Sequence, residues 1–137
     1  MKHVLIGVIG SSRADGEAIA LAKEVGKGIA RGGGILLCGG LGGVMEAAAQ
    51  GAKEEGGITV GVLPGTCRDE ANDYIDIPIV TGMGFARNII IVRSSHAVIA
   101  VKGESGTLSE IAYALQLSVP IVGLKTWRLS EISAIGE

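Results

Sequence analysis

Apolar runs and helical stripes alternate along the whole chain. The run from Val4 to Ile9 is continuously apolar, as in a strand that is buried on both faces. The residues that follow it place apolar side chains at helical spacing from Ala18 to Ile29, which predicts a helix. The same alternation predicts further strands at 35–38, 58–62, 77–80, 97–101 and 120–124, and further helices at 44–52, 83–93 and 108–117. After Lys125 the pattern weakens, and 127–137 is compatible with a loop or a short helix.

Strands that alternate with helices predict an α/β fold of one domain over residues 1–137. Right-handed crossovers then give a Rossmann-like, doubly wound, mostly parallel sheet with helices on both faces. We expect the strand order 3-2-1-4-5, with His96–Val101 as the fourth strand. The short strand 77–80 belongs at an edge, because Pro78 cannot donate a ladder hydrogen bond.

Composition agrees with a closely packed α/β domain and excludes several function classes. The 137 residues include 23 glycines, 47% are hydrophobic and only 3% are aromatic. This composition suits helices that pack on a buried sheet through small side chains. Twelve basic and fourteen acidic residues give a net charge of −2, which disfavours nucleic-acid binding. No apolar run approaches the ~18 residues of a membrane span. We therefore expect neither nucleic acid nor membrane as a partner.

The cysteines and histidines predict no metal site and no disulfide. Cys38 and Cys67 are too few for a disulfide scaffold, and with His3 and His96 they show no metal-ligand spacing. The opening apolar run has no marked basic segment before it and no small-residue cleavage site after it, so it is predicted to be a strand rather than a signal peptide. A reducing, cytoplasmic location is expected.

Three glycine- or serine-bearing loops are predicted to meet at one edge of the sheet. Ligands of open α/β sheets bind beyond the carboxyl ends of the strands, at the point where the strand order reverses. The loops expected there are 10–16, 39–43 and 102–106.

The loop from Gly39 to Gly43 is a candidate phosphate-binding loop. Glycines let the backbone approach a phosphate, and the N–H groups at the start of the following helix favour an anion. The pattern is not a GxGxxG motif, since Met45 takes the place of the third glycine. The alternative is a tight strand-to-helix turn. The candidate binding residues are Gly39, Gly40, Gly42, Gly43 and Met45.

The first loop offers hydroxyl groups and one positive charge. Ser11 and Ser12 follow Gly10 at the end of the first strand, and Arg13 could add charge to a phosphate site. The alternative is that one of the serines is an ordinary helix N-cap.

The third loop and one arginine complete the candidate site. Gly103, Glu104, Gly106 and Thr107 precede the helical stripe at 108–117, and Thr107-x-x-Glu110 also matches a capping box, in which Glu110 only bonds the backbone of Thr107. Arg87 could reach the same crevice, or it could be a solvated or ion-paired arginine.

Five motifs follow one another along the chain. They are Gly10-Ser11-Ser12, Gly39 to Met45, Gly61 to Pro64, Ala86-Arg87-Asn88 and Gly103-x-x-Gly106-Thr107-x-x-Glu110. Taken together, these motifs resemble the Lonely-Guy-like proteins, which are also labelled lysine-decarboxylase-like. The resemblance spans Val4 to Leu124, and the Ala-Arg-Asn form and small size are nearest to the molybdenum-cofactor-carrier-like branch. The resemblance implies a Rossmann-type fold, a nucleotide-like ligand and a homo-oligomer, a homodimer or a homotetramer.

The chain departs from the enzymes of that family at three positions. Lys102 stands where their proline is, Glu104 replaces their second glycine, and Asn88 replaces the usual lysine. The carboxylate of Glu104 would repel a phosphate. Either the phosphate is then bound by the loops that begin at Gly10 and Gly39, or Glu104 points outward and pairs with Lys102. The catalytic residues that carry over are limited to Arg87 and Glu110.

Two functions follow from the resemblance. The first is a binding protein for a phosphorylated nucleotide or a pterin-nucleotide-type cofactor, such as the molybdenum cofactor, with no cofactor required for chemistry of its own. The alternative is a nucleoside 5′-monophosphate phosphoribohydrolase, in which Arg87 orients the substrate and Glu110 stabilises the ribosyl cation. Lysine decarboxylation is disfavoured, because no lysine occupies an evident Schiff-base site.

An oligomer interface is predicted at one of two helices. In the predicted helix at 83–93, residues 89–92 are all apolar. Apolar side chains therefore point in almost every direction around the helix, whereas a helix with one buried face needs them on one side only. The helix at 108–117 is the other candidate.

Overall fold

The fold of the chain is given by a computed structural model, which describes residues 3–103 and 105–125. The prediction for 127–137 lies outside these residues. In chain order the elements are β1 (Leu5–Gly10), α1 (Gly16–Arg31), β2 (Ile35–Cys38), α2 (Val44–Glu54), β3 (Thr59–Leu63), the 3-10 helix η1 (Arg68–Glu70), β4 (Ile77–Val80), the 3-10 helix η2 (Gly84–Ala86), α3 (Arg87–Ser94), β5 (Ala97–Val101), α4 (Ser105–Gln116) and β6 (Ile121–Leu124).

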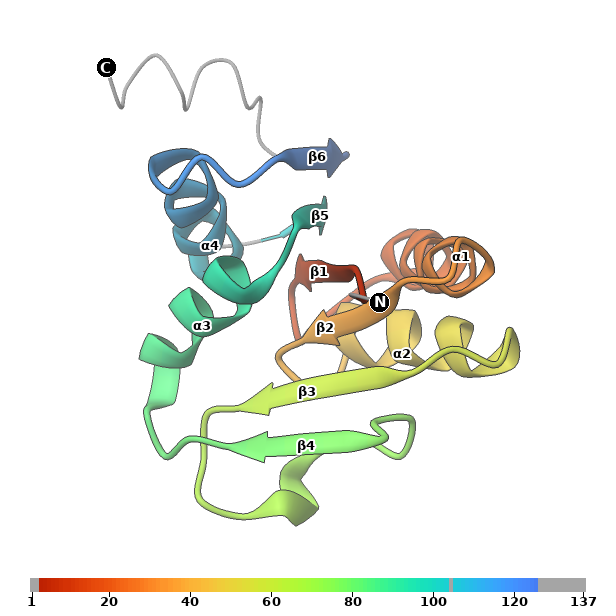
Figure 1. Cartoon of the computed structure of the whole chain (residues 1–137), viewed down its shortest axis with the longest axis horizontal. Coiled ribbons are helices and arrows are strands. Elements are labelled where there is room, and N and C mark those ends of the chain that lie inside the picture. The colour runs from red at the N-terminus through yellow and green to blue at the C-terminus, as the bar shows by residue number, and fades with distance from the viewer. Residues whose placement is uncertain (1–2, 104, 126–137) are drawn as a thin grey trace.

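The sheet confirms the predicted fold class and strand order. The strands are arranged β4-β3-β2-β1-β5-β6, and the strand pairs are all parallel. Strand β4 lies at one edge, as Pro78 requires, and β6 lies at the other (Figure 1). The order reverses at β1, between β2 and β5, so the switch point is where the sequence places it.

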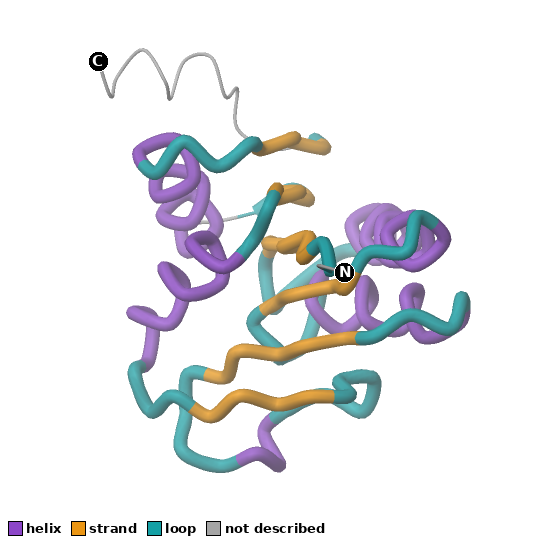
Figure 2. The backbone as a smooth tube through the Cα atoms, viewed as in Figure 1, coloured by secondary structure: helices purple, strands orange, loops and turns teal. Residues whose placement is uncertain are grey.

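Helices cover both faces of the sheet in two layers. Helices α1 and α2 pack on one face and α3 and α4 on the other (Figure 1), and the strands run between the two layers (Figure 2). Each layer has its own apolar core. Val8, Leu36 and Ala48 belong to the core under α1 and α2, whereas Ile9, Ile91 and Ile111 belong to the core under α3 and α4.

Helices α1 and α2 touch through glycines. A Cβ atom on Gly26 of α1 would overlap the carbonyl oxygen of Ala48, and one on Gly51 of α2 would overlap the carbonyl oxygen of Lys23. Backbone atoms therefore meet directly between the two helices. Part of the high glycine content is thus explained by helix packing rather than by ligand binding.

The predicted helix at 83–93 is wrong at its start. The segment Gly84–Ala86 is a 3-10 turn, and the α-helix begins only at Arg87. Gly82 and Gly84 both have positive φ, 63° and 60°, which a right-handed helix does not allow.

We find no membrane-spanning helix in residues 3–103 and 105–125, where none of the helices combines the necessary length with the necessary apolar character.

Candidate functional site

A cavity of about 250 Å³ opens at the carboxyl ends of β1 and β2, against α3 and α4. It brings together residues from four of the five motifs, and only the motif from Gly61 to Pro64 contributes none to its lining. The predicted site residues that line it are Gly10, Ser11, Ser12, Gly39, Met45, Arg87, Thr107 and Glu110. Phe85 and Asn88 also line it. Neither was predicted as a binding residue from the sequence, although Asn88 is the last residue of the Ala-Arg-Asn motif and Phe85 directly precedes that motif.

Two further predicted residues line a neighbouring cavity. Arg13 and Gly103 border a space of about 200 Å³ beside the start of α1, and Ser11 lines both cavities. The Arg13 side chain is exposed. The hydroxyl oxygen of Ser11 accepts a hydrogen bond from the Arg13 backbone N–H at 3.0 Å, so this serine shapes its own loop rather than capping α1. The N-cap of α1 is Asp15, whose carboxylate accepts from the N–H of Ala18 at 2.9 Å.

The remaining glycines of the second loop lie beside the cavity rather than in its wall. Gly40 has φ +77°, and a Cβ atom there would lie 2.6 Å from the Leu63 side chain. Gly43 has φ +64° and packs against the backbone of Ser11 and Ser12. These contacts make both glycines necessary for the turn itself. Their predicted role in ligand binding, and that of Gly42, stay predictions.

The first loop closes on the start of α2. The N–H of Val44, the first residue of the helix, donates to the carbonyl oxygen of Ser11 at 3.0 Å. One of the helix N-terminal donors expected to face an anion is therefore already bonded within the protein. This contact holds the first and second loops to each other.

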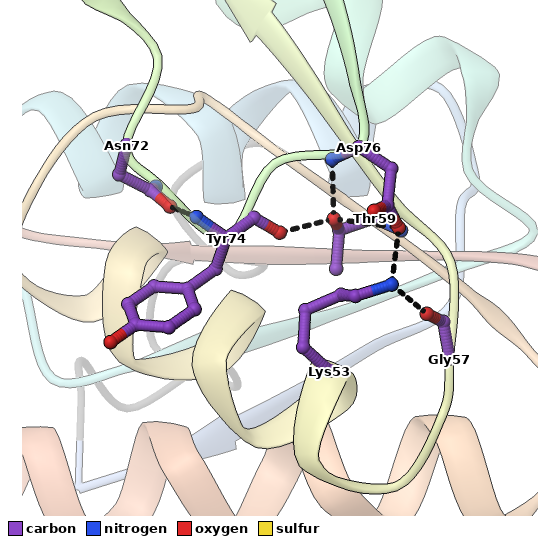
Figure 3. A network of polar contacts seen from close by, with 6 residues as sticks. All are labelled: Lys53, Gly57, Thr59, Asn72, Tyr74 and Asp76. Carbon is purple, nitrogen blue, oxygen red and sulfur yellow. Dashed lines mark hydrogen bonds and ion pairs between the residues drawn. The ribbon is translucent and has the colours of Figure 1, made fainter.

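Asn72 fixes the second loop from the other side. Its side-chain amide donates to the carbonyl oxygen of Leu41 at 2.8 Å, and its backbone N–H donates to that of Gly40 at 2.9 Å. Its own side-chain oxygen accepts from the N–H of Tyr74 at 3.0 Å (Figure 3). Asn72 belongs to none of the motifs found in the sequence, so the sequence carried no signal for this role.

A polar network anchors the segment that carries Asn72. The buried Thr59 hydroxyl contacts the carbonyl oxygen of Tyr74 at 2.5 Å, and the Asp76 carboxylate accepts from the N–H of Thr59 at 3.0 Å. Lys53 of α2 pairs with that carboxylate at 2.9 Å (Figure 3). Burial by itself would raise the pKa of the Asp76 carboxyl, but the ammonium group of Lys53 and the N–H and hydroxyl groups of Thr59 together hold it below its usual value. These contacts attach the segment that carries Asn72 to β3 and α2.

Arg87 lies buried beneath the glycine loop, which contradicts the alternative of a solvated arginine. It is 7% exposed, and its Nε donates to the carbonyl oxygen of Val62 at 2.9 Å. Its Nη1 donates to the side-chain oxygen of Asn88. Burial lowers the pKa of Arg87 below its ordinary value, while the negative charge of Glu110 opposes that shift. The guanidinium is a cation held in the cavity wall.

Gly39 makes the room that the guanidinium needs. A Cβ atom on Gly39 would lie 2.6 Å from Nη2 of Arg87 and 2.7 Å from the sulfur of Met45. These predicted site residues therefore depend on each other sterically. A glycine is needed at this position to accommodate the Arg87 side chain, independently of any contact between its backbone and a ligand.

The capping-box prediction for Glu110 is wrong. Helix α4 begins at Ser105, two residues before Thr107, so Thr107 is inside the first turn and is not the N-cap. Glu110 is only 8% exposed and lines the cavity. Burial raises the pKa of Glu110 to about 8, although the positive charge of Arg87 lowers it. At neutral pH most of this carboxyl group is therefore protonated.

The loop before α4 is shaped by Gly103 and Lys102. Gly103 has φ +132°, and a Cβ atom there would lie 2.5 Å from the side chain of the buried Thr107. Lys102 pairs with Asp15 at 2.9 Å and with Glu17 at 3.0 Å. These two carboxylates of the α1 N-terminus are the described partners of Lys102. Glu104 lies outside the described residues, and Gly106 is in the first turn of α4.

The cysteines and His96 are placed as structural or surface groups. Burial raises the pKa of Cys38 to about 12, so its thiol stays protonated. Cys67 is exposed, and Nδ1 of His96 accepts from the backbone N–H of Leu5 at 3.0 Å. Across residues 3–103 and 105–125, no cluster of three or more His, Cys, Asp or Glu side chains is placed to hold a metal ion.

The steric role of Gly39 can be tested by substitution. Gly39→Ala is expected to lower the free energy of unfolding by about 1–3 kcal/mol, because Arg87 and Met45 must both shift. Gly42→Ala is the matched control, since its Cβ would lie 3.7 Å from the nearest atom, and its effect should stay within about 0.5 kcal/mol. Urea unfolding of both variants measures the difference. Equal stability of the two would contradict this account of Gly39.

A six-stranded parallel sheet with a buried arginine, a buried carboxyl group and glycine loops at its switch point defines a Rossmann-like protein of the Lonely-Guy type. The sequence profile of the SLOG cluster4 family matches residues 3–136, and the chain belongs to that family. This confirms the resemblance seen in the sequence motifs.

The solved structures that the chain resembles include molybdenum cofactor proteins. It is 42% identical to the molybdenum cofactor binding protein of Rippkaea orientalis, with a TM-score of 0.91 over 99% of this chain and 84% of the other. It is 45% identical to the molybdenum cofactor carrier protein of Chlamydomonas reinhardtii, with a TM-score of 0.87 over 95% and 81% of the two chains.

A similarity to an enzyme also exists. The chain is 37% identical over 120 residues to the cytokinin riboside 5′-monophosphate phosphoribohydrolase of Mycobacterium tuberculosis. The match covers 81% of this chain and 64% of that enzyme.

Proposed function

We propose that this protein binds a phosphorylated nucleotide or a pterin-nucleotide-type cofactor, and that the ligand is the molybdenum cofactor. The observation that carries the proposal is the cavity at the switch point, which the buried Arg87 and the glycine-bearing loops surround. The similarity to two molybdenum cofactor proteins above 40% identity supports the choice of ligand. The protein needs no resident cofactor for this function, and we place it in the cytoplasm.

The arrangement of charges favours an anionic ligand. At neutral pH the guanidinium of Arg87 is charged while Glu110 is largely neutral, because burial raises the pKa of this carboxyl group to about 8. The cavity wall therefore carries net positive charge. The neighbouring cavity adds the exposed Arg13.

Mass spectrometry of the co-purifying ligand tests the proposed function. The protein is purified from cells that make the molybdenum cofactor, and the bound small molecules are released and identified. We expect a phosphorylated pterin together with molybdenum, and we expect Arg87→Met to lose both. A preparation that carries no pterin or nucleotide, from the same cells, would overturn the proposal.

The second candidate function is hydrolysis of nucleoside 5′-monophosphates. The similarity to the mycobacterial phosphoribohydrolase and the presence of both Arg87 and Glu110 in one cavity favour it. Against it, a carboxylate that stabilises an oxocarbenium-like state must be ionised, and Glu110 is mostly protonated at pH 7. Incubation with AMP separates the two functions, since release of adenine that Glu110→Gln abolishes would establish the enzyme.

We propose that the protein forms a homodimer or homotetramer through the segment that leads into α3. Met83 is 47% exposed and Phe85 is 86% exposed, next to Ile79 and Val80 of the edge strand β4, which are 44% and 43% exposed. Exposed apolar side chains in such a group are typical of an interface. Light scattering at micromolar concentration should give at least twice the mass of the chain, and Met83→Lys should reduce that mass. A monomeric wild type would contradict the proposal.

A further inference from the structure

The inner wall of the cavity carries buried polar groups without partners. Glu110 is 8% exposed, and within residues 3–103 and 105–125 neither of its carboxylate oxygens has a hydrogen-bond partner. Asn88 is 4% exposed, and its side-chain oxygen is bonded to Arg87, whereas its amide nitrogen has no partner among the same residues. Buried polar groups are normally hydrogen-bonded. Both side chains line the same cavity, so a ligand that enters it can supply the missing partners.

The size and the walls of the cavity limit what can enter. Its volume of about 250 Å³ lies below the roughly 300–1,000 Å³ of pockets that enclose a whole drug-sized ligand. The volume therefore matches a part of a nucleotide-type ligand, such as one planar ring system, rather than the whole ligand. Apolar walls suited to the faces of such a ring are supplied by Ile9, Met45 and Ile91.

We propose that this cavity recognises the 2-amino-4-oxopyrimidine edge that pterin and guanine rings share. That edge presents an amino group and a ring N–H as neighbouring donors, followed by an oxo group as an acceptor. The two oxygens of the Glu110 carboxylate accept the two donated hydrogen bonds. The free amide nitrogen of Asn88 donates to the oxo group. This proposal rests on the proposed function, and it specifies the ring edge of the ligand that the cavity recognises.

The same polar groups discriminate against adenine. Adenine presents an amino group beside a ring nitrogen that only accepts, so the Glu110 carboxylate would face a lone pair. A site built to satisfy polar groups rejects a ligand that leaves them unpaired. Discrimination is strongest above pH 8, where Glu110 is ionised in the empty protein. The charged or titratable groups near this carboxyl are Arg87 of α3 and Cys38 of β2, and the Cys38 thiol is protonated in this range.

Calorimetric titration with GMP, AMP and 6-hydroxymethylpterin at pH 8.5 tests the proposal. GMP and AMP share the ribose phosphate, so a difference between them reports on the ring edge alone. We expect GMP to bind at least 10-fold more tightly than AMP, and the pterin to compete with GMP. Glu110→Gln should abolish this preference, because one of its two side-chain atoms now donates. Glu46→Gln, in the first turn of α2 and outside the cavity wall, should retain it.

The possible outcomes separate this inference from the proposed function. Equal affinity for GMP and AMP, tighter binding of AMP, or an unchanged preference in Glu110→Gln overturns the edge recognition while leaving a ligand-binding protein. Competition by inorganic phosphate but not by the pterin also overturns it, because the cavity is then a phosphate site. Failure of the wild type to bind any of the three probes overturns the edge recognition, and the co-purified ligand then decides the proposed function by itself. Far-ultraviolet circular dichroism of each variant verifies that it is folded.

Discussion

Glu110→Gln is expected to stabilise the protein at alkaline pH and to flatten the dependence of its stability on pH. Burial raises the pKa of this carboxyl group from 4.5 to about 8. Between these two values the folded protein holds a proton that the unfolded chain has released, so the stability of the wild type falls as pH rises from about 4.5 to 8. The linked change in the free energy of unfolding is on the order of 5 kcal/mol. Glutamine has nothing to ionise, so the variant avoids this loss.

Urea unfolding of the wild type and of Glu110→Gln between pH 5 and 9 measures this effect. The two curves of stability against pH should diverge as pH rises and run parallel above about pH 8. Glu46→Gln serves as the control, because Glu46 lies outside the cavity in the first turn of α2. Parallel curves over the whole range would show that Glu110 ionises freely in the folded protein. Such a result would also remove the basis for a neutral Glu110 beside Arg87.

Gly26→Ala is expected to destabilise the protein by about 3 kcal/mol or more. The added Cβ would overlap the carbonyl oxygen of Ala48 at the contact between α1 and α2. Overpacking usually costs about 1–3 kcal/mol, and the effect lies at or above that range here because a backbone atom cannot rotate away. The two helices would have to separate, and the buried alanines between them would lose contact.

Gly28→Ala is the matched control on the same helix. Nothing lies within 4 Å of a Cβ atom at Gly28, so the substitution only replaces glycine by a better helix former. It should stabilise the protein by about 0.5–1 kcal/mol. Urea unfolding of both variants at one pH gives the comparison. If Gly26→Ala were as stable as Gly28→Ala, close contact of the helix backbones could not be the reason for Gly26.

Much of the architecture could be predicted from the sequence because it depends on local patterns. Continuous apolar runs and helical stripes located the strands and helices, and Pro78 indicated that the strand 77–80 lies at an edge. Parallel strands put their carboxyl ends on one side of a sheet, so the loops after β1 and β2 were correctly expected at the same place. The family motifs singled out Arg87 and Glu110, and the structure brings both to one cavity.

The properties that give these residues their chemistry were decided by tertiary packing. Glu110 and Thr107 fit a capping box in the sequence, but the helix starts earlier and the carboxyl group lines the cavity. Its burial raises its pKa, although the nearby Arg87 lowers it. Local spacing cannot distinguish these cases, because burial depends on chain segments distant in the sequence. The roles of the glycines were decided in the same way. Gly26 and Gly51 allow close helix packing, Gly39 makes room for a guanidinium, and Gly84 interrupts a helix. The sequence alone does not distinguish these roles, because each depends on the atoms that surround the glycine in the fold.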